Sequence, residues 1–262
     1  MANKLKSIMS EPYQVILYSI LALAASAGIA AIASAIDNSN ISILTVITPT
    51  ILAAIFSAIF IGKTGLKQLF IAQLFKPVKL IWLSIALFGI PALAVVSILI
   101  SQQFGGDGLY LTNSNLMPQL VVILLISIGE EFGWRGYLLP KLQNHYNALI
   151  ASLILALIWS LWHYPAYLIG VGTPLDVPFY IFMLWVFPVT LIITWVYNNS
   201  GSILLPIIMH SAANASFSYL PILPETTGEH TSFYIFIAVV WVAAITMVII
   251  FKPAKFIYTP NV

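Results

Sequence analysis

The sequence predicts an all-α, polytopic membrane protein with about eight transmembrane helices, and three observations lead to this prediction. Of the 262 residues, 61% are hydrophobic and only 7% are charged, against roughly 25% charged residues in soluble globular proteins. The mean hydropathy is +1.01. Apolar runs of about 20 residues recur along the chain, each long enough to cross about 30 Å of hydrocarbon as a helix that satisfies its own backbone. We expect residues 1–262 to form a single integral membrane domain.

Each expected span is an apolar run bounded by polar or turn-forming residues. The runs cover approximately residues 15–36, 41–61, 80–100, 116–135, 148–164, 177–197, 203–220 and 232–251. Pro49 is expected to interrupt the second span, Pro91 to kink the third and Pro165 to stop the fifth. Residues 136–147 are expected to be a connector. Between Gly62 and Lys79, lysines flank apolar side chains, which predicts a segment lying on the membrane surface.

The lysines predict the orientation of the chain. If the N-terminus is cytoplasmic, every lysine falls on the cytoplasmic side, as the positive-inside rule requires: Lys4, Lys6, Lys63, Lys67, Lys76, Lys79, Lys141, Lys252 and Lys255. Both termini are then cytoplasmic. The chain has no cysteine, which excludes disulfides, thiolate metal ligands and a cysteine nucleophile. No basic and aromatic pattern indicates binding of nucleic acid.

The fourth span carries three charges where the bilayer makes charge costly. Glu130, Glu131 and Arg135 lie within six residues, and one charge near the bilayer centre already costs about 2.5–3.5 kcal/mol. Consecutive helical residues point about 100° apart, and Arg135 follows Glu131 at the i+4 spacing of a same-face ion pair. We therefore expect Glu131 and Arg135 to pair, and Glu130 to face the interior as a general base or metal ligand. A salt-bridge cluster that only closes the bundle is the alternative.

Polar side chains on two later spans could join Glu130. His163 lies near the end of the fifth span, and His210 lies inside the seventh, with Asn214 four residues later on the same side. Contacts between helices are the alternative explanation. The set suits hydrolysis by a water that Glu or His deprotonates, with His or Asn stabilising the oxyanion. It also suits a zinc site formed by Glu130, His163 and His210, with water as the fourth ligand.

Three motifs resemble those of the CPBP intramembrane protease family, which groups the type II CAAX prenyl endopeptidases with bacteriocin-processing and self-immunity proteins. The motifs are, in this order, Glu130-Glu131-x-x-x-Arg135, Trp159-x-x-x-His163 and His210-x-x-x-Asn214. The resemblance covers roughly residues 116–217, which we expect to be the protease-like core. Trp159 stands where the family pattern usually has Phe, and it keeps an aromatic wall there.

The resemblance implies an intramembrane endopeptidase with a polar cavity between spans four, five and seven, open to the cytoplasm or the inner leaflet. Glu130 and His163 would activate water, and His210 with Asn214 would stabilise the oxyanion. Glu131, Arg135 and Trp159 would support them. The same residues serve a metal-free glutamate mechanism and a zinc metalloprotease.

The implied substrate is a peptide or a membrane-associated protein in contact with lipid. In a bacterial plasma membrane, a membrane peptide or bacteriocin precursor is expected rather than a prenylated protein. A non-proteolytic immunity or binding protein of the same fold is the first alternative. A proton-coupled transporter that uses the Glu and His residues as a relay is the second.

Overall fold

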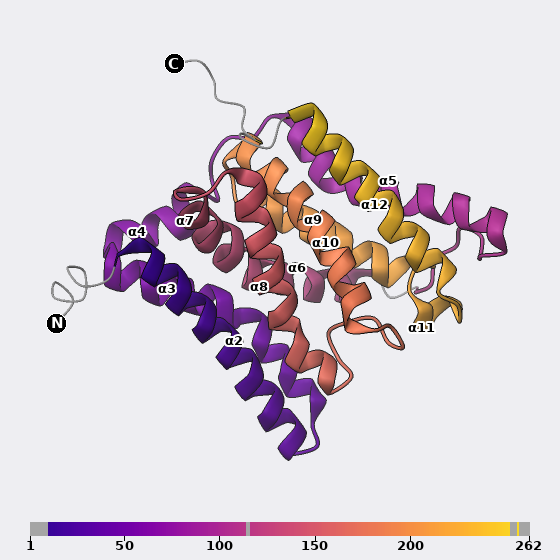
Figure 1. Cartoon of the computed structure of the whole chain (residues 1–262), viewed down its shortest axis with the longest axis horizontal. Coiled ribbons are helices and arrows are strands. Elements are labelled where there is room, and N and C mark those ends of the chain that lie inside the picture. Colours follow the sequence, from indigo (N-terminus) through magenta and orange to yellow (C-terminus); the bar gives the residue numbers. More distant parts are fainter. Residues whose placement is uncertain (1–9, 114–115, 252–255, 257–262) are drawn as a thin grey trace.

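The computed structural model describes residues 10–113, 116–251 and 256, and these residues form a bundle of helices (Figure 1). Within them, seven helices are long and apolar enough to cross a membrane. A further helix, α10 (Leu204–Tyr219), has 16 residues and spans about 24 Å at 1.5 Å per residue. The predicted class of polytopic helical membrane protein is confirmed. The count of eight crossings stays a prediction, and both termini lie outside the described residues.

The bounds of the elements follow the predicted spans closely. In chain order they are α2 (Glu11–Ala35), η1 (Ser39–Ile47), α3 (Thr48–Phe60), α4 (Lys63–Lys67), η2 (Gln68–Ala72), α5 (Leu80–Ser101), η3 (Gln102–Phe104), α6 (Leu116–Gly133), η4 (Trp134–Leu138), α7 (Leu139–Gln143), α8 (Ala148–Leu168), α9 (Phe179–Ser200), α10, α11 (Pro224–Thr227) and α12 (Thr231–Phe251).

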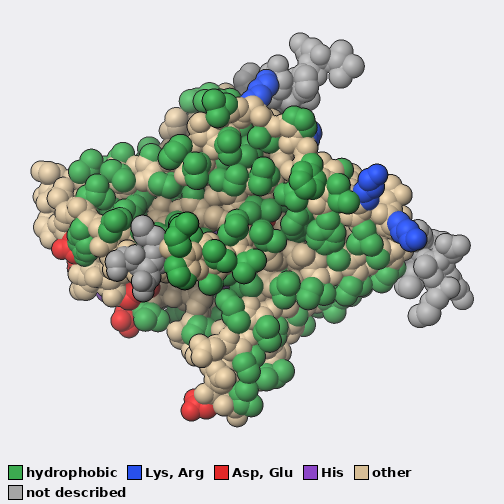
Figure 2. Space-filling model, turned by 180° about the vertical axis from the view of Figure 1, so that it is seen from behind, with side chains coloured by type: hydrophobic (Ala, Val, Ile, Leu, Met, Phe, Trp, Pro, Cys, Tyr) green, Lys and Arg blue, Asp and Glu red, His purple; other side chains and the backbone are tan. Residues whose placement is uncertain are grey.

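Helix α10 and the C-terminal half of α6 lie inside the bundle. Helix α10 packs against α5, α6 and α9, while α6 also packs against α3, and α8 packs against α2 and α9. Figure 1 shows α2 and α3 at one edge and α5 and α12 at the other. Apolar side chains cover much of the outer surface (Figure 2), among them Ile16, Leu125 and Ile249, which are 54%, 60% and 73% exposed. Helices that are apolar on all sides are typical of a membrane environment.

The prolines behave as predicted in the second span but not in the fifth. The 3-10 helix η1 ends at Ile47, and α3 begins at Thr48 with Pro49 in its first turn, where the missing N–H has no partner to lose. Pro91 lies within α5. Pro165, however, lies inside α8, which continues to Leu168. The prediction that Pro165 stops the fifth span was therefore wrong, because membrane helices tolerate an internal proline when neighbouring groups satisfy the freed carbonyl.

The fourth span also extends further than predicted. Helix α6 leads directly into the π-helical turn η4 and then into α7, which ends at Gln143. Residues 136–143 were predicted as part of a connector and are helical instead. The wider π turn begins at Trp134, three residues after Glu131, and includes Arg135; such turns are frequent at functional sites.

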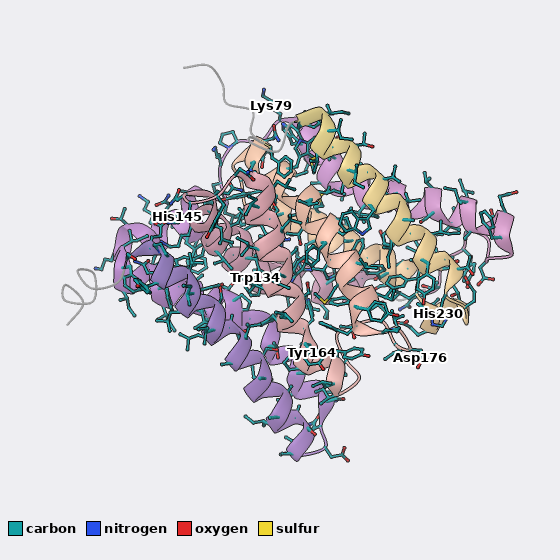
Figure 3. All side chains as sticks on the ribbon, viewed as in Figure 1. Lys79, Trp134, His145, Tyr164, Asp176 and His230 are labelled. Carbon is teal, nitrogen blue, oxygen red and sulfur yellow. The ribbon has the colours of Figure 1, made fainter. Side chains whose placement is uncertain are left out.

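Charged side chains separate to opposite ends of the bundle. Lys79 and His145 lie at the end away from Asp176 and His230 (Figure 3). In Figure 2, Lys and Arg side chains lie at the upper and right edges, Asp and Glu lie at the left and lower edges, and apolar side chains fill the area between. Glu11 is an acidic residue at the lysine-bearing end, 3.4 Å from Lys141. The predicted orientation requires this separation.

Two glycines allow α6 to lie directly against η1 and α3. A Cβ added to Gly129 would lie 2.8 Å from the carbonyl oxygen of Val46, and one added to Gly133 would lie 2.4 Å from Cβ of Pro49. Glycines four residues apart share one helix face, and small residues at this spacing let membrane helices approach closely. Sequence reasoning missed this contact, although the Gly-x-x-x-Gly spacing was visible.

We expect Gly133→Ala to lower the free energy of unfolding by about 1–3 kcal/mol, because the new methyl group must displace the backbone of Pro49. The measurement is unfolding of the purified protein in detergent. Gly28→Ala in α2 is the matched control, since nothing lies within 4 Å of a Cβ there, and Ala favours a helix by about 1 kcal/mol over Gly. An equal loss of stability in both variants would contradict this account of the packing.

Candidate active site

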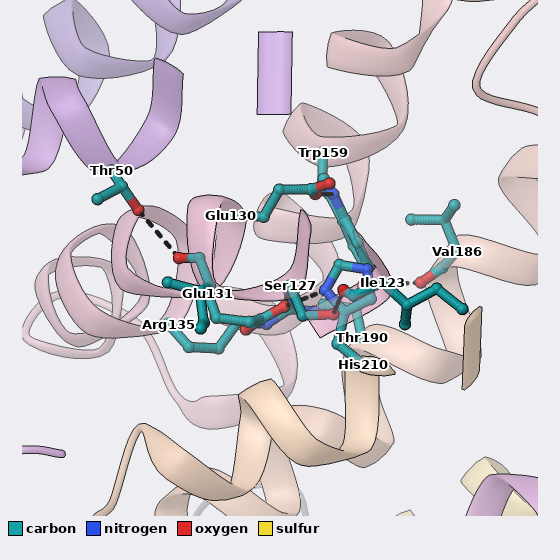
Figure 4. A network of polar contacts seen from close by, with 11 residues as sticks. Thr50, Ile123, Ser127, Glu130, Glu131, Arg135, Trp159, Val186, Thr190 and His210 are labelled. Atoms are coloured by element: carbon teal, nitrogen blue, oxygen red, sulfur yellow. Dashed lines mark hydrogen bonds and ion pairs between the residues drawn. The ribbon is translucent and has the colours of Figure 1, made fainter. Parts of the chain in front are cut away.

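Glu131 is the centre of a buried ionic network (Figure 4). Its Oε1 accepts a hydrogen bond from Nη1 of Arg135 at 2.7 Å and lies 2.9 Å from Nδ1 of His210. Glu131 and Arg135 are both 0% exposed, and His210 is 5% exposed. The ion pair expected from the i+4 spacing is therefore present. His210, from α10, joins the same carboxylate oxygen.

Trp159, on α8, connects the two glutamates. Its indole Nε1 donates a hydrogen bond to Oε2 of Glu130 at 2.8 Å. The guanidinium carbon of Arg135 lies 4.4 Å from the centroid of the indole ring, within the range of a cation–π interaction. The His210 ring stands edge-on to the same indole, with centroids 5.4 Å apart. The aromatic wall predicted at this position is thus also a hydrogen-bond donor, which Phe could not be.

His163 and Asn214 lie at the margin of this network. The His163 ring meets the rings of Trp159, Trp162 and Phe182, with centroids 6.0, 4.8 and 5.1 Å away. Asn214 follows His210 by one turn on α10. Neither side chain makes a hydrogen bond to another residue that the structure describes. The structure therefore brings together Glu130, Glu131, Arg135, Trp159 and His210.

The arrangement does not form the predicted zinc site. No three His, Asp or Glu side chains come together as metal ligands within the described residues, which include every predicted ligand. Nδ1 of His210 is directed to Glu131, and Oε2 of Glu130 holds the indole of Trp159. Glu130, His163 and His210 therefore do not fit a zinc ion in the arrangement that the structure shows.

The network is not electrically neutral, and some of its buried polar atoms lack hydrogen-bond partners. Two ionised carboxylates and one guanidinium leave a net charge of −1, which one added proton would neutralise. Oε2 of Glu131 and both Nε and Nη2 of Arg135 are buried without a partner among the described residues. A buried polar group without a partner costs about 1–3 kcal/mol. These atoms thus mark a place where a water, a proton or a ligand group would be stabilised.

The network is closed in this conformation. Glu130 is 2% exposed, and the polar cavity that we expected around it stays a prediction. An apolar cavity of about 430 Å³ lies between α5, α6 and α10, and its lining includes Ser211 and Ala212, the two residues that follow His210 in the chain. A peptide bond could reach Glu130 only after the surrounding helices separate.

Comparisons with known proteins agree with the geometry. Residues 112–216 match the family described as type II CAAX prenyl endopeptidase Rce1-like, and this range includes every predicted site residue. A protein named CAAX prenyl protease 2, from Methanococcus maripaludis, is 34% identical over 193 residues, which cover 66% of this chain and 70% of that protein. The motif order, the buried glutamate pair and these similarities together show that the chain belongs to the CPBP family of intramembrane proteases.

Proposed function

We propose that this protein is an intramembrane endopeptidase that hydrolyses a peptide bond with a water activated by Glu130. The observation that carries the proposal is the different environment of the two adjacent carboxylates. Glu131 is engaged by Arg135 and His210, whereas Glu130 accepts one hydrogen bond, from Trp159, through Oε2. Oε1 of Glu130 has no hydrogen bond to another described residue, so it is the oxygen that can accept a proton from water.

In the proposed reaction Glu130 carries one proton of the water to the leaving amine, and the other proton of the water stays on the new carboxyl group. Glu130 takes a proton from water as the water oxygen attacks the carbonyl carbon, and it returns that proton to the leaving amine when the C–N bond breaks. His163, one turn beyond Trp159 on α8, assists Glu130 once the helices separate.

His210 and Asn214 stabilise the oxyanion in this scheme. An ionised carboxylate can only accept hydrogen bonds, so the contact with Glu131 places a proton on Nδ1 of His210. Nε2 is then the ring nitrogen left for the substrate, and a proton on it can be donated to the oxyanion together with a hydrogen bond from the Asn214 amide. Glu131 thus acts on the reaction through His210.

The apolar cavity between α5, α6 and α10 supports a substrate that carries an apolar segment. Ser211 and Ala212 line the cavity from α10, while Leu87, Leu120 and Leu124 line it from the facing helices. We propose a peptide or membrane-associated protein as the substrate, with its apolar part in this cavity during cleavage. A bacterial membrane peptide and a location in the plasma membrane stay predictions.

Glu130→Gln should lower kcat for peptide cleavage at least about 100-fold with little change in KM, because a general base contributes about 10²–10⁴-fold to the rate. The assay uses purified protein in liposomes and a library of internally quenched membrane peptides. Glu225→Gln is the matched control, since Glu225 lies on the short helix α11, outside the network. Undiminished cleavage by Glu130→Gln would show that hydrolysis takes place at another site.

Prolonged treatment with a chelator should leave the cleavage rate unchanged, since Glu130 activates water without a bound metal in this scheme. The metal content of the protein is measured on the same samples before and after treatment. Loss of activity that added zinc restores would overturn the metal-free scheme and favour the ligand set of Glu130, His163 and His210.

A further inference from the structure

A second, polar pocket lies at the lysine-bearing end of the bundle and takes no part in the proposed reaction. Its volume is about 600 Å³. The start of α2, the end of α3, the short helices α4 and η2, the turn η4 with α7, and the end of α9 form its walls. The pocket is therefore built from segments far apart in the sequence.

Hydrogen-bond donors without acceptors line this pocket. Tyr137 is 4% exposed, and its buried hydroxyl has no partner in the part of the chain that the structure describes. Nδ2 of Asn198 is also buried without a partner, while Oδ1 of Asn198 accepts a hydrogen bond from Gln143. The ammonium group of Lys76 forms no ion pair or hydrogen bond with another described residue. Two buried donors that lack an acceptor, beside the ammonium group of the exposed Lys76, indicate that the missing group is an anion.

Gly201 holds the ammonium group of Lys76 at the pocket. A Cβ added to Gly201 would lie 2.1 Å from Nζ of Lys76, so the ammonium rests directly on the glycine. Gly201 follows the last residue of α9 with a φ of 62°, and the C-terminal end of a helix carries a partial negative charge that attracts a cation. Lys76 is thereby kept beside Tyr137 and Asn198 in the lining.

The remaining charges of the pocket leave it positive overall. Glu11 is the one carboxylate among its lining residues, and it is engaged by Nζ of Lys141 at 3.4 Å, by Nδ2 of Asn144 at 2.8 Å and by His145 at 3.4 Å. Lys76 and Lys141 against Glu11 give a net charge of +1. An anion would therefore enter a pocket whose single negative group is already paired.

Apolar side chains beside the pocket favour a lipid as the source of the anion. Ile61 lines the pocket and is 48% exposed. On the chain segment between Ile61 and Lys76, Ile71 and Phe75 are 50% and 76% exposed. We propose that this pocket binds the phosphate group of an anionic phospholipid, with the acyl chains lying along these apolar side chains. Basic pockets between membrane helices on the cytoplasmic side are suited to such headgroups.

Titration of the purified full-length chain in detergent with short-chain phosphatidylglycerol, followed by native mass spectrometry, tests the proposal. We expect one saturable site for this lipid and weaker binding of phosphatidylcholine of the same chain length. Tyr137→Phe removes only the buried hydroxyl and should raise Kd about tenfold. Lys76→Gln should raise Kd by a similar or larger factor, because it removes a charged donor.

Lys67→Gln is the matched control, because it makes the same charge change on α4, outside the lining of the pocket. It should change Kd less than about twofold, because this exposed charge does not line the pocket. An equal rise in Kd for phosphatidylglycerol in Lys67→Gln and Lys76→Gln would show that only the general surface charge attracts the lipid. This result would overturn the proposal. Displacement of the lipid by inorganic phosphate at equal concentration would also overturn it, because free phosphate would then be the ligand.

A second measurement distinguishes the loss of a lipid contact from misfolding of the variant. Without lipid, Tyr137→Phe should be at least as stable as the wild-type protein, since the hydroxyl that it loses has no partner. Added phosphatidylglycerol should then raise the unfolding temperature of the wild-type protein more than that of the variant. An equal rise in both would contradict a role for the Tyr137 hydroxyl.

Discussion

Glu131 and Arg135 form an ion pair without any exposed surface, and the surrounding helices are arranged to stabilise it. Moving two charges out of water costs several kcal/mol per ion, which their attraction offsets only if further groups satisfy the remaining donors and acceptors. His210 reaches the pair from α10 and Trp159 covers Arg135 from α8. The ion pair thus fixes how closely three helices must approach.

The same pair separates the tasks of two adjacent glutamates. Glu131 is occupied by two cationic or polar partners, so it holds helices and orients His210. Glu130 points to another side of α6, and among the described residues its carboxylate accepts a hydrogen bond only from the indole N–H of Trp159. Because the one indole touches Glu130, Arg135 and His210, a shift of α8 would alter all three at once. Such a shift is one way in which the closed network could open to a substrate.

Sequence reasoning recovered the features that depend on local spacing. Hydropathy located the long helices, and the i+4 spacing found the pair of Glu131 and Arg135. The partner of His210 could not be predicted, because it depends on the rotation of α10 about its own axis. The hydrogen bond from the indole of Trp159 to Glu130 could not be predicted either, because it depends on the rotation of α8. Pro165 was misjudged, since its effect is set by the neighbours of α8 rather than by its own backbone.

Glu131 stabilises the fold and Glu130 does not, although the two residues are adjacent. The most direct measurement compares the free energies of unfolding of Glu131→Gln and Glu130→Gln in the same detergent. Glu131→Gln should lose about 3–5 kcal/mol, because the buried Arg135 loses the carboxylate with which it forms its ion pair. Glu130→Gln should lose no more than about 1 kcal/mol, since its amide oxygen can still accept the hydrogen bond from Trp159. Equal losses in the two variants, or a larger loss in Glu130→Gln, would contradict the account.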